Sequence, residues 1–390
     1  MEKRDLTFPQ KNIYMVELIN GDNALNTIAG VLKINDSFDS EICKKIINEV
    51  IKQNDATRIN IIEGENISQV VNEYKYVYVQ EIDMKSKSEE EVNKLLDDLT
   101  KEKIDIYSNS LITFYVISTH DKSGMIYLKM HHIIGDAWTL MQITNQLTEM
   151  YEKILNGEDI SFEVPSYLEF IDSEIEYEKS EKCEKDREFW KEYLKDVKEP
   201  VSLKDRTKKI SNSAKRYSVL LSSEQNTAIE EYCKKNRVSP YTLFMTALAT
   251  YIYRIKDAND IIIGTPILNR SNFREKKMLG CFISTIPMRI RIEEGVKFLD
   301  LVKSVTTKTM SLFRHQKYPI TKILEDIHNE SENSGKIYNL MLSYQNARAD
   351  VPSNMSTEWI FSKYIQDDLE IHIMDMDSVR PSYNKLRLFR

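Results

Sequence analysis

Cysteine is scarce in this sequence, and its spacing excludes two kinds of protein. The 390 residues contain four cysteines, Cys43, Cys183, Cys233 and Cys281, and none belongs to a Cys-x-x-Cys pair. Such spacing offers neither the ligand pairs of a structural zinc site nor the framework of a disulfide-stapled domain. Cys43 and Cys233 fall on apolar faces of expected helices, so we interpret the cysteines as small core residues in a reducing compartment.

Long hydrophobic runs and an excess of basic charge are also missing. No window approaches the ~18 apolar residues of a membrane span, and the N-terminal segment MEKRDLTFPQ has no apolar signal-peptide core. Lysine and arginine number 54 against 61 aspartates and glutamates, a net charge of −7, with both signs mixed along the chain. This balance argues against nucleic-acid binding. We therefore expect a cytoplasmic enzyme that contacts no membrane.

Helical and strand patterns alternate along the chain, without low-complexity tracts or a repeat period. The length and an apolar content of 41% favour two well-filled α/β lobes of similar size. A charged segment at 171–195 is expected to be a solvated helix, anchored by Trp190 and Tyr193, that carries the chain between the lobes. The hydrophobic periodicity predicts helices over 39–53, 89–103, 140–154, 223–236, 240–253 and 297–313, and strands over 74–79, 111–118, 125–130, 261–263, 282–290, 337–344 and 369–374.

The segment MHHIIGDAW at 130–138 carries the clearest chemistry. Two histidines end a predicted strand, and Asp136 follows where a helix begins. Histidine, with a pKa of ~6.5, both accepts and donates a proton near neutrality, which suits acyl transfer. Three other interpretations stay open on this segment alone. The histidines can be packing residues or metal ligands, although no further ligand lies at suitable spacing, and Asp136 can be only a helix N-cap.

Several segments in order resemble the condensation domains of nonribosomal peptide synthetases, whose superfamily includes chloramphenicol acetyltransferase. His131-His132-x-x-x-Asp136 is similar to the family's active-site motif. GTPILNR at 264–270 resembles its G-x-P-x-x-x-R segment, and HQKYP at 315–319 its HQ-x-x-P segment. GCFISTIPMR at 280–289 resembles the strand before the bridge between lobes, while Gln10 and Arg58 fit two early blocks. The resemblance covers almost the whole chain.

The resemblance implies an α/β (α+β) fold of two chloramphenicol-acetyltransferase-like lobes in a V shape. Each lobe would hold a mixed β-sheet with flanking helices, and the active site would lie in the tunnel between them. We expect residues 1–175 to form the N-terminal lobe, which carries the histidine motif. Residues 176–390 would form the C-terminal lobe.

The resemblance also implies roles for individual residues. His132 would accept a proton from the attacking amine or orient its lone pair, while His131 packs beneath it and sets the loop. Asp136 would form a buried ion pair with an arginine, which either Arg270 or Arg58 could supply. The backbone from Gly135 through Ala137 to Trp138 would favour a developing oxyanion. His315 is expected to be a structural or bridge residue and not a second catalyst.

Three departures from the family pattern stand out. The motif usually closes in Asp-Gly, whereas here Ala137 follows the aspartate. Because alanine disfavours positive φ by about 1 kcal/mol or more, that backbone should be right-handed or extended, and activity should survive. Ser284 replaces a common asparagine, which puts an amide contact there in doubt. The run SVRPSYNKLRLFR at 378–390 suggests a shortened or altered C-terminus of lower stability.

The function implied is amide bond formation in nonribosomal peptide synthesis. Two carrier proteins would present a thioester donor and an α-amine acceptor on phosphopantetheine arms, with an adjacent adenylation domain loading substrate. No bound cofactor or metal is expected, and the domain should be monomeric. It could be a starter domain that N-acylates the first amino acid with a fatty acyl group. The alternatives are a free-standing acyltransferase using acyl-CoA and a catalytically silent module that docks carriers.

Overall fold

The computed structural model describes residues 2–20, 22–120, 122–161, 163–204, 211–330, 336–346, 349–374 and 385–389. The chain divides into two compact units. The first contains Met1–Glu176, Arg270–Phe282 and Arg348–Tyr364, and the second contains Tyr177–Asn269, Ile283–Ala347 and Ile365–Arg390. The first segment of the first unit ends at Glu176, one residue after the expected end of the N-terminal lobe at 175. Two later segments expected in the second lobe nevertheless belong to the first unit, because their strand pairing and buried contacts are made there.

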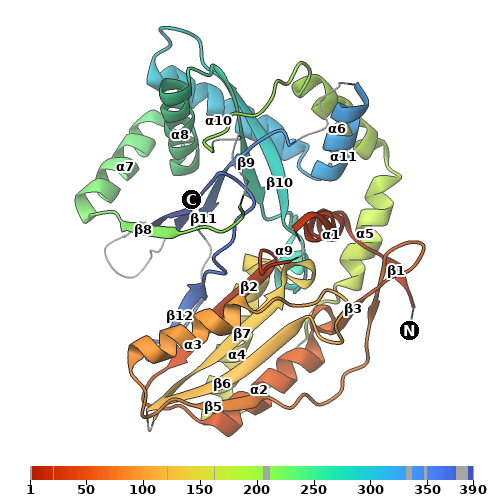
Figure 1. Ribbon diagram of the computed structural model, residues 1–390, viewed down its shortest axis with the longest axis vertical. Helices are drawn as coiled ribbons and strands as arrows, with labels where there is room; N and C mark the ends of the chain where they lie inside the picture. Colours follow the sequence, from red (N-terminus) through yellow and green to blue (C-terminus); the bar gives the residue numbers. More distant parts are fainter. Residues whose placement is uncertain are drawn as a thin grey trace. The chain divides into compact units, whose positions relative to one another are not determined.

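A mixed five-stranded sheet forms the centre of the first unit (Figure 1). Its strand order is β12-β2-β7-β6-β5, with only β5 and β6 parallel. Its strands are β2 (Thr27–Ile34), β5 (Gln80–Asp83), β6 (Ile112–His120), β7 (Ser123–His131) and β12 (Met355–Ile360).

Helices cover both faces of this sheet, which explains the almost unbroken apolar sequence of β7. Alternate residues point to opposite faces of a strand. On one face Tyr127 packs in a cluster with Leu96 of α3 (Glu89–Lys101). On the other face Gly30 lies against Leu140 of α4 (Ala137–Leu155), which packs beside α2 (Ser40–Gln53). The motif at the end of β7 is therefore carried by a well-packed central strand.

Smaller elements complete the first unit. A three-stranded sheet has the order β1-β4-β3, and its edge strand β1 precedes helix α1. The helix α5 runs across the first break between the units. The bounds are β1 (Arg4–Asp5), α1 (Phe8–Asn20), η1 (Asp55–Arg58), β3 (Ile59–Ile62), β4 (Ser68–Val71), η2 (His132–Ile134), α5 (Leu168–Glu178) and α9 (Phe273–Lys277).

The second unit contains a mixed six-stranded sheet in the order β10-β9-β11-β13-β14-β8. Each unit thus has a mixed sheet, as expected for this α/β fold. Strand β9 is parallel to β11 and β11 to β13, while the other pairs are antiparallel. Its strands are β8 (Arg216–Leu220), β9 (Asp260–Ile267), β10 (Ser284–Arg291), β11 (Leu340–Gln345), β13 (Leu369–Met374) and β14 (Lys385–Phe389). Its helices are α6 (Glu181–Tyr193), α7 (Ser223–Asn236), α8 (Pro240–Lys256), α10 (Phe298–Arg314) and α11 (Ile320–Glu330).

Two elements differ from the sequence prediction. Residues 74–79 are not a paired strand, because the side chain of Asn48 bonds the backbone N–H and carbonyl of Val77 in place of a neighbouring strand. The expected single helix at 171–195 is two helices, α5 and α6. The chain breaks at Ser180, whose hydroxyl accepts from the Cys183 N–H and caps the second helix.

The altered C-terminal run lies partly outside the described residues, at 378–384 and at 390. Its remaining residues form β14, which pairs with β13 on one side and with β8 on the other. The unusual sequence thus supplies an inner strand of the second sheet.

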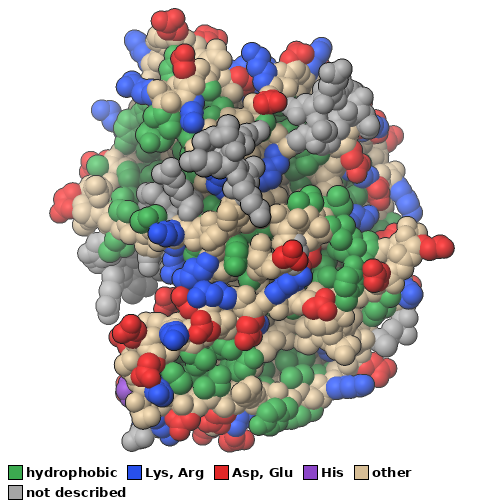
Figure 2. Space-filling view, in the orientation of Figure 1, with side chains coloured by type: hydrophobic (Ala, Val, Ile, Leu, Met, Phe, Trp, Pro, Cys, Tyr) green, Lys and Arg blue, Asp and Glu red, His purple; other side chains and the backbone are tan. Residues whose placement is uncertain are grey.

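The surface carries charges of both signs (Figure 2), and the cysteines lie in the interior. On the face shown in Figure 2, acidic and basic side chains are interspersed. All four cysteines are described, and each is buried as a free thiol. Among the described residues no helix is both long and apolar enough to cross a membrane.

Candidate active site

The histidine motif stands where β7 ends and α4 is about to begin. His131 is the last residue of β7 and His132 opens the short helix η2. Asp136 caps α4 by accepting a hydrogen bond from the Thr139 N–H at 2.9 Å. The segment between them is therefore held at both ends by regular structure.

His131 is buried beneath the loop. Its Nδ1 accepts a hydrogen bond from the Ile133 N–H at 3.1 Å, and its Nε2 lies 3.4 Å from the Glu17 carboxylate. An acceptor Nδ1 carries no proton, so the proton of the neutral ring sits on Nε2 and points toward Glu17. The ring is engaged on both edges, which fits a residue that shapes the loop.

His132 is half-buried, unlike the fully buried His131. Its backbone N–H donates to the Asn26 carbonyl at 2.7 Å, whereas its buried Nδ1 makes no hydrogen bond to any described residue. Burial lowers the pKa of His132, although the backbone carbonyls of His132 and Gly135 and the Asp136 carboxylate act in the opposite sense. The imidazole therefore stays neutral to lower pH than an exposed histidine.

Asp136 is both the expected N-cap and one partner of a buried ion pair. Arg270 donates from Nη1 to Oδ2 at 2.8 Å and from Nη2 to Oδ1 at 3.1 Å, and the Phe282 N–H donates to Oδ2 at 3.1 Å. Both side chains are almost fully buried. Burial would raise the pKa of Asp136, but Arg270 and the backbone donors hold it below its usual value. The pair is an ionised fork-to-fork contact within the first unit.

Thr139 and Gly280 tie the segment 270–282 to α4. The Thr139 hydroxyl donates to the Gly280 carbonyl at 2.7 Å and accepts from the Gly280 N–H at 3.0 Å. The guanidinium of Arg270 also lies 4.0 Å from the Phe282 ring centroid. These contacts bring residues from two distant parts of the sequence to one side of the histidine loop.

Gly280 cannot carry a side chain in this arrangement. Its φ is +144°, and a Cβ would lie 2.2 Å from the buried ring of Tyr167. We expect Gly280→Ala to lower the free energy of unfolding by about 2–4 kcal/mol, the combined effect of backbone strain and overpacking. Urea unfolding measures the change. Gly157→Ala is the matched control, because Gly157 also has positive φ (+73°) but no atom within 4 Å of the added Cβ. Equal losses in the two variants would contradict the steric explanation.

The loop residues between the histidines and α4 have distinct places. A Cβ on Gly135 would lie 2.7 Å from the Met130 sulfur, so a larger residue there would require the side chains of Met130 and Thr139 to shift. Ala137 is the first residue of α4 and is not among the described residues with positive φ, as expected for an alanine. The Trp138 indole Nε1 donates to the Lys276 carbonyl at 2.9 Å, a further link to the segment 270–282.

Two predicted site residues do not join this cluster. Arg58 donates instead to backbone carbonyls, to Asn72 from Nε at 2.9 Å and to Lys52 from Nη1 at 2.8 Å. Of the two arginines considered for the ion pair, Arg270 is therefore the partner of Asp136. Ser284 begins β10 opposite Ile267 of β9, in the second unit.

His315 also belongs to the second unit, where neighbouring side chains engage its ring and its backbone. Its ring stacks on Phe189 with centroids 3.8 Å apart, and its Nδ1 lies 2.6 Å from an Asp186 oxygen. Its carbonyl accepts from the Trp190 indole at 2.9 Å. The expected helix anchor Trp190 is thus buried against this residue.

Three residues near the histidines were missed by the sequence analysis: Glu17, Asn26 and Thr139. Thr139 carries no signal beyond its position three residues after a helix cap. Glu17 does carry one, since it shares a buried face of α1 with Ile13. A carboxylate on the apolar face of a helix becomes buried and then needs hydrogen-bond or ion-pair partners. This pattern could have marked Glu17 as a residue with such partners.

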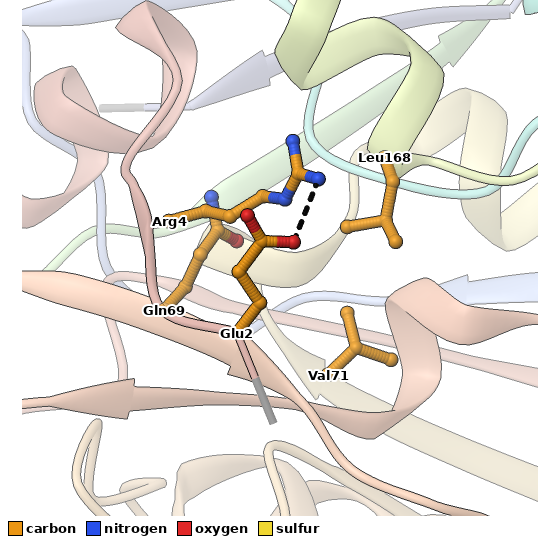
Figure 3. Close-up of a pocket in the computed structure, with 5 residues that line it drawn as sticks. All are labelled: Glu2, Arg4, Gln69, Val71 and Leu168. Carbon is orange, nitrogen blue, oxygen red and sulfur yellow. Dashed lines mark hydrogen bonds and ion pairs between the residues drawn. The ribbon is translucent and has the colours of Figure 1, made fainter.

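A small pocket lies elsewhere on the first unit (Figure 3). Glu2, Arg4, Gln69, Val71 and Leu168 line it, and Arg4 Nη2 donates to a Glu2 oxygen at 3.1 Å. No residue of the segment 130–138 is among its lining residues. We assign this pocket no part in the chemistry of the histidines.

Comparison with known proteins gives a family match over nearly the whole chain. A family model described as Condensation domain matches residues 2–383. A plipastatin synthase subunit from Bacillus subtilis (strain 168) is 28% identical over 378 residues, covering 95% of this chain and 15% of that protein. Surfactin synthase subunit 1 of the same strain is 30% identical over 380 residues, with 95% and 11% covered. The chain thus spans only a small part of the length of these relatives.

Solved structures share the fold. The starter condensation domain of rhizomide synthetase, solved as a mutant in complex with C8-CoA, superposes with a TM-score of 0.87 at 18% identity, covering 99% of this chain and 88% of that one. The first condensation domain of the calcium-dependent antibiotic synthetase, in complex with a substrate analogue, gives 0.85 at 17% identity, with 100% and 91% covered. At such identities the likeness concerns the fold alone.

Proposed function

This chain belongs to the condensation-domain family, and from that premise we propose that it joins two carrier-bound substrates through an amide bond. The donor is an acyl or aminoacyl thioester, and the acceptor is the α-amine of an aminoacyl thioester. The observation that carries the proposal is His132: a half-buried imidazole kept neutral by burial, on a loop fixed by the Asp136–Arg270 pair.

The reaction requires one proton to move. The amine nitrogen attacks the thioester carbon, the carbon–sulfur bond breaks, and the proton lost by the amine ends on the departing thiolate. We assign the role of base to the neutral His132 imidazole, whose unprotonated ring nitrogen can accept that proton. An α-amine has a pKa near ~8, so much of it is already neutral, and orienting its lone pair contributes alongside base strength.

The remaining residues of the motif act by position. His131 supports the loop from below, and Asp136 with Arg270 holds its far end. For the oxyanion, Ala137 and Trp138 at the start of α4 are the better backbone donors, because the Gly135 N–H is directed to the His132 carbonyl at 3.4 Å. Asp136 carries no proton in this scheme.

The partners in this proposal are donor and acceptor carrier proteins with phosphopantetheine arms, and an adjacent adenylation domain. The relatives described above are far longer than this chain, as expected if such domains lie beside it. The proposal retains a cytoplasmic, monomeric domain without a cofactor of its own. In its finer form the chain is a starter domain with a fatty acyl donor, a role that its structural neighbour's description suggests.

Reconstitution with loaded carriers tests the proposal. The chain is mixed with a leucyl-carrier acceptor and, in separate reactions, octanoyl-, acetyl- and alanyl-carrier donors, and products are identified by mass spectrometry. We expect amide formation that depends on the chain, with octanoyl preferred if it is a starter domain. Other aminoacyl acceptors extend the panel.

Two controls separate the competing functions. Soluble octanoyl-CoA as donor tests for an acyltransferase that needs no donor carrier, and equal rates with CoA and carrier would favour it. A binding measurement with loaded carriers tests for a silent docking module. Carrier binding without product, across the whole panel, would count against the proposed chemistry.

A further inference from the structure

Glu17 places a carboxylate in the interior of the first unit, against the ring of His131. It lies on α1 and is only 6% exposed. An ionised carboxylate in such a position needs hydrogen-bond donors to offset its lost hydration. The donors are Asn26 Nδ2 at 2.7 Å and His131 Nε2 at 3.4 Å, and both reach the same atom, Oε2.

The contact with His131 fixes the orientation of that ring. Because the Ile133 N–H occupies Nδ1, the Nε2 proton has the Glu17 oxygen as its acceptor. Rotating the ring would break contacts on both edges. Glu17 therefore holds the side chain that lies beneath the His132 loop.

The contact with Asn26 reaches His132 itself. While the Asn26 side chain donates to Glu17, its backbone carbonyl accepts from the His132 N–H at 2.7 Å. One carboxylate oxygen is thus linked to the first histidine through its ring and to the second through its backbone. This arrangement joins α1, the residues before β2 and the end of β7.

The charge of Glu17 is maintained by the same neighbours. Burial would raise its pKa, but His131, Asn26 and Lys103 bring the pKa down to about 2. Lys103 Nζ lies 3.4 Å from the other oxygen, Oε1, and is itself 41% exposed in its side chain. The carboxylate is ionised at neutral pH, and its two oxygens have separate partners.

We infer that Glu17 is a positioning residue for the reaction of His132, acting through His131 and Asn26 without touching substrate. The inference rests on the proposed function. It concerns the geometry at Oε2, so the length of the side chain at position 17 should matter more than its charge. A shift of about 1 Å in a reacting group is enough to slow a reaction by 10²-fold.

Three substitutions at Glu17 test the inference, with kcat and KM measured per folded molecule in the carrier assay. We expect Glu17→Ala to lower kcat about 10- to 100-fold with little change in KM. Glu17→Gln should stay within about 5-fold of wild type, because its amide oxygen can accept from both donors. Glu17→Asp keeps the charge but withdraws the oxygen by one methylene, so its kcat should fall below that of Glu17→Gln. This comparison does not depend on the alanine variant folding.

Lys103→Gln is the matched control, since it removes the ion pair at Oε1 and leaves the Oε2 contacts in place. We expect unchanged kcat. Wild-type kcat in Glu17→Asp and in folded Glu17→Ala would overturn the inference, as would higher activity in Glu17→Asp than in Glu17→Gln. His132→Ala, assayed in parallel, distinguishes a failure of the proposed function from a failure of this inference. Full activity there overturns the proposed function and this inference together, whereas its loss with unimpaired Glu17 variants overturns this inference alone.

Discussion

His132→Ala should lower the rate of amide formation at least about 100-fold while leaving the fold intact. General acid–base catalysis typically contributes 10²–10⁴-fold, and both ring nitrogens of His131, the other imidazole of this loop, already have partners. The His132 side chain is half-buried and its Nδ1 makes no hydrogen bond to a described residue, so we expect its removal to cost little stability. Single-turnover kinetics with pre-loaded carriers measures the chemical step, and circular dichroism checks the fold.

The matched control is His120→Ala. His120 is exposed at the far end of β6, so its replacement should leave both rate and fold unchanged. His132→Gln adds a second comparison, since glutamine orients the amine without accepting its proton at neutral pH. Substantial activity in the glutamine variant would show that orientation supplies most of the effect. Normal turnover in His132→Ala would remove the assignment of His132 as the catalytic residue.

Asp136→Ala should reduce stability by about 3–5 kcal/mol, because it leaves the Arg270 guanidinium buried without its counter-charge. This loss of stability should be at least as pronounced as any loss of catalytic rate. The double variant Asp136→Ala/Arg270→Met leaves no uncompensated charge, so it should recover part of that loss. Urea unfolding of the single and double variants measures both changes and the coupling between the two residues.

An exposed ion pair on the same segment provides the control. Arg274 and Glu169 also join the segment 270–282 to the rest of the first unit, but their side chains are 64% and 43% exposed. Glu169→Ala should therefore change stability by no more than about 1 kcal/mol. A fully stable but inactive Asp136→Ala would contradict the structural role of the buried pair. It would point to a direct part for Asp136 in the reaction.

Local sequence patterns were a good guide where the residues that decide an element are close together. The apolar run of β7 predicted a strand, and the Ser239-Pro240 pair marked the start of α8, which begins at Pro240 with Ser239 as its cap. The two expected interpretations of Asp136, helix cap and ion-pair partner, are both present in the structure. The cap was readable locally, because its acceptor and donor are three residues apart.

Local sequence patterns were misleading where a segment forms its hydrogen bonds with residues far away in the sequence. The alternating residues 74–79 look like a strand, yet Asn48 bonds the backbone at Val77. Strand β12 lies 321 residues or more after its partner β2 in the chain, and the sequence contains no periodicity that assigns it to the first unit. Hydrogen bonds of this kind depend on which segments meet after folding.

By itself, the sequence singled out the candidate site and predicted most of the elements around it. The motif from His131 to Asp136 and its neighbours along the chain are matters of residue type and spacing, which act over a few residues. Only the tertiary structure decided that Arg270, 134 residues away, pairs with Asp136 while Arg58 does not. It alone placed Glu17 against His131, because a carboxylate becomes buried and needs donors only once distant segments have packed.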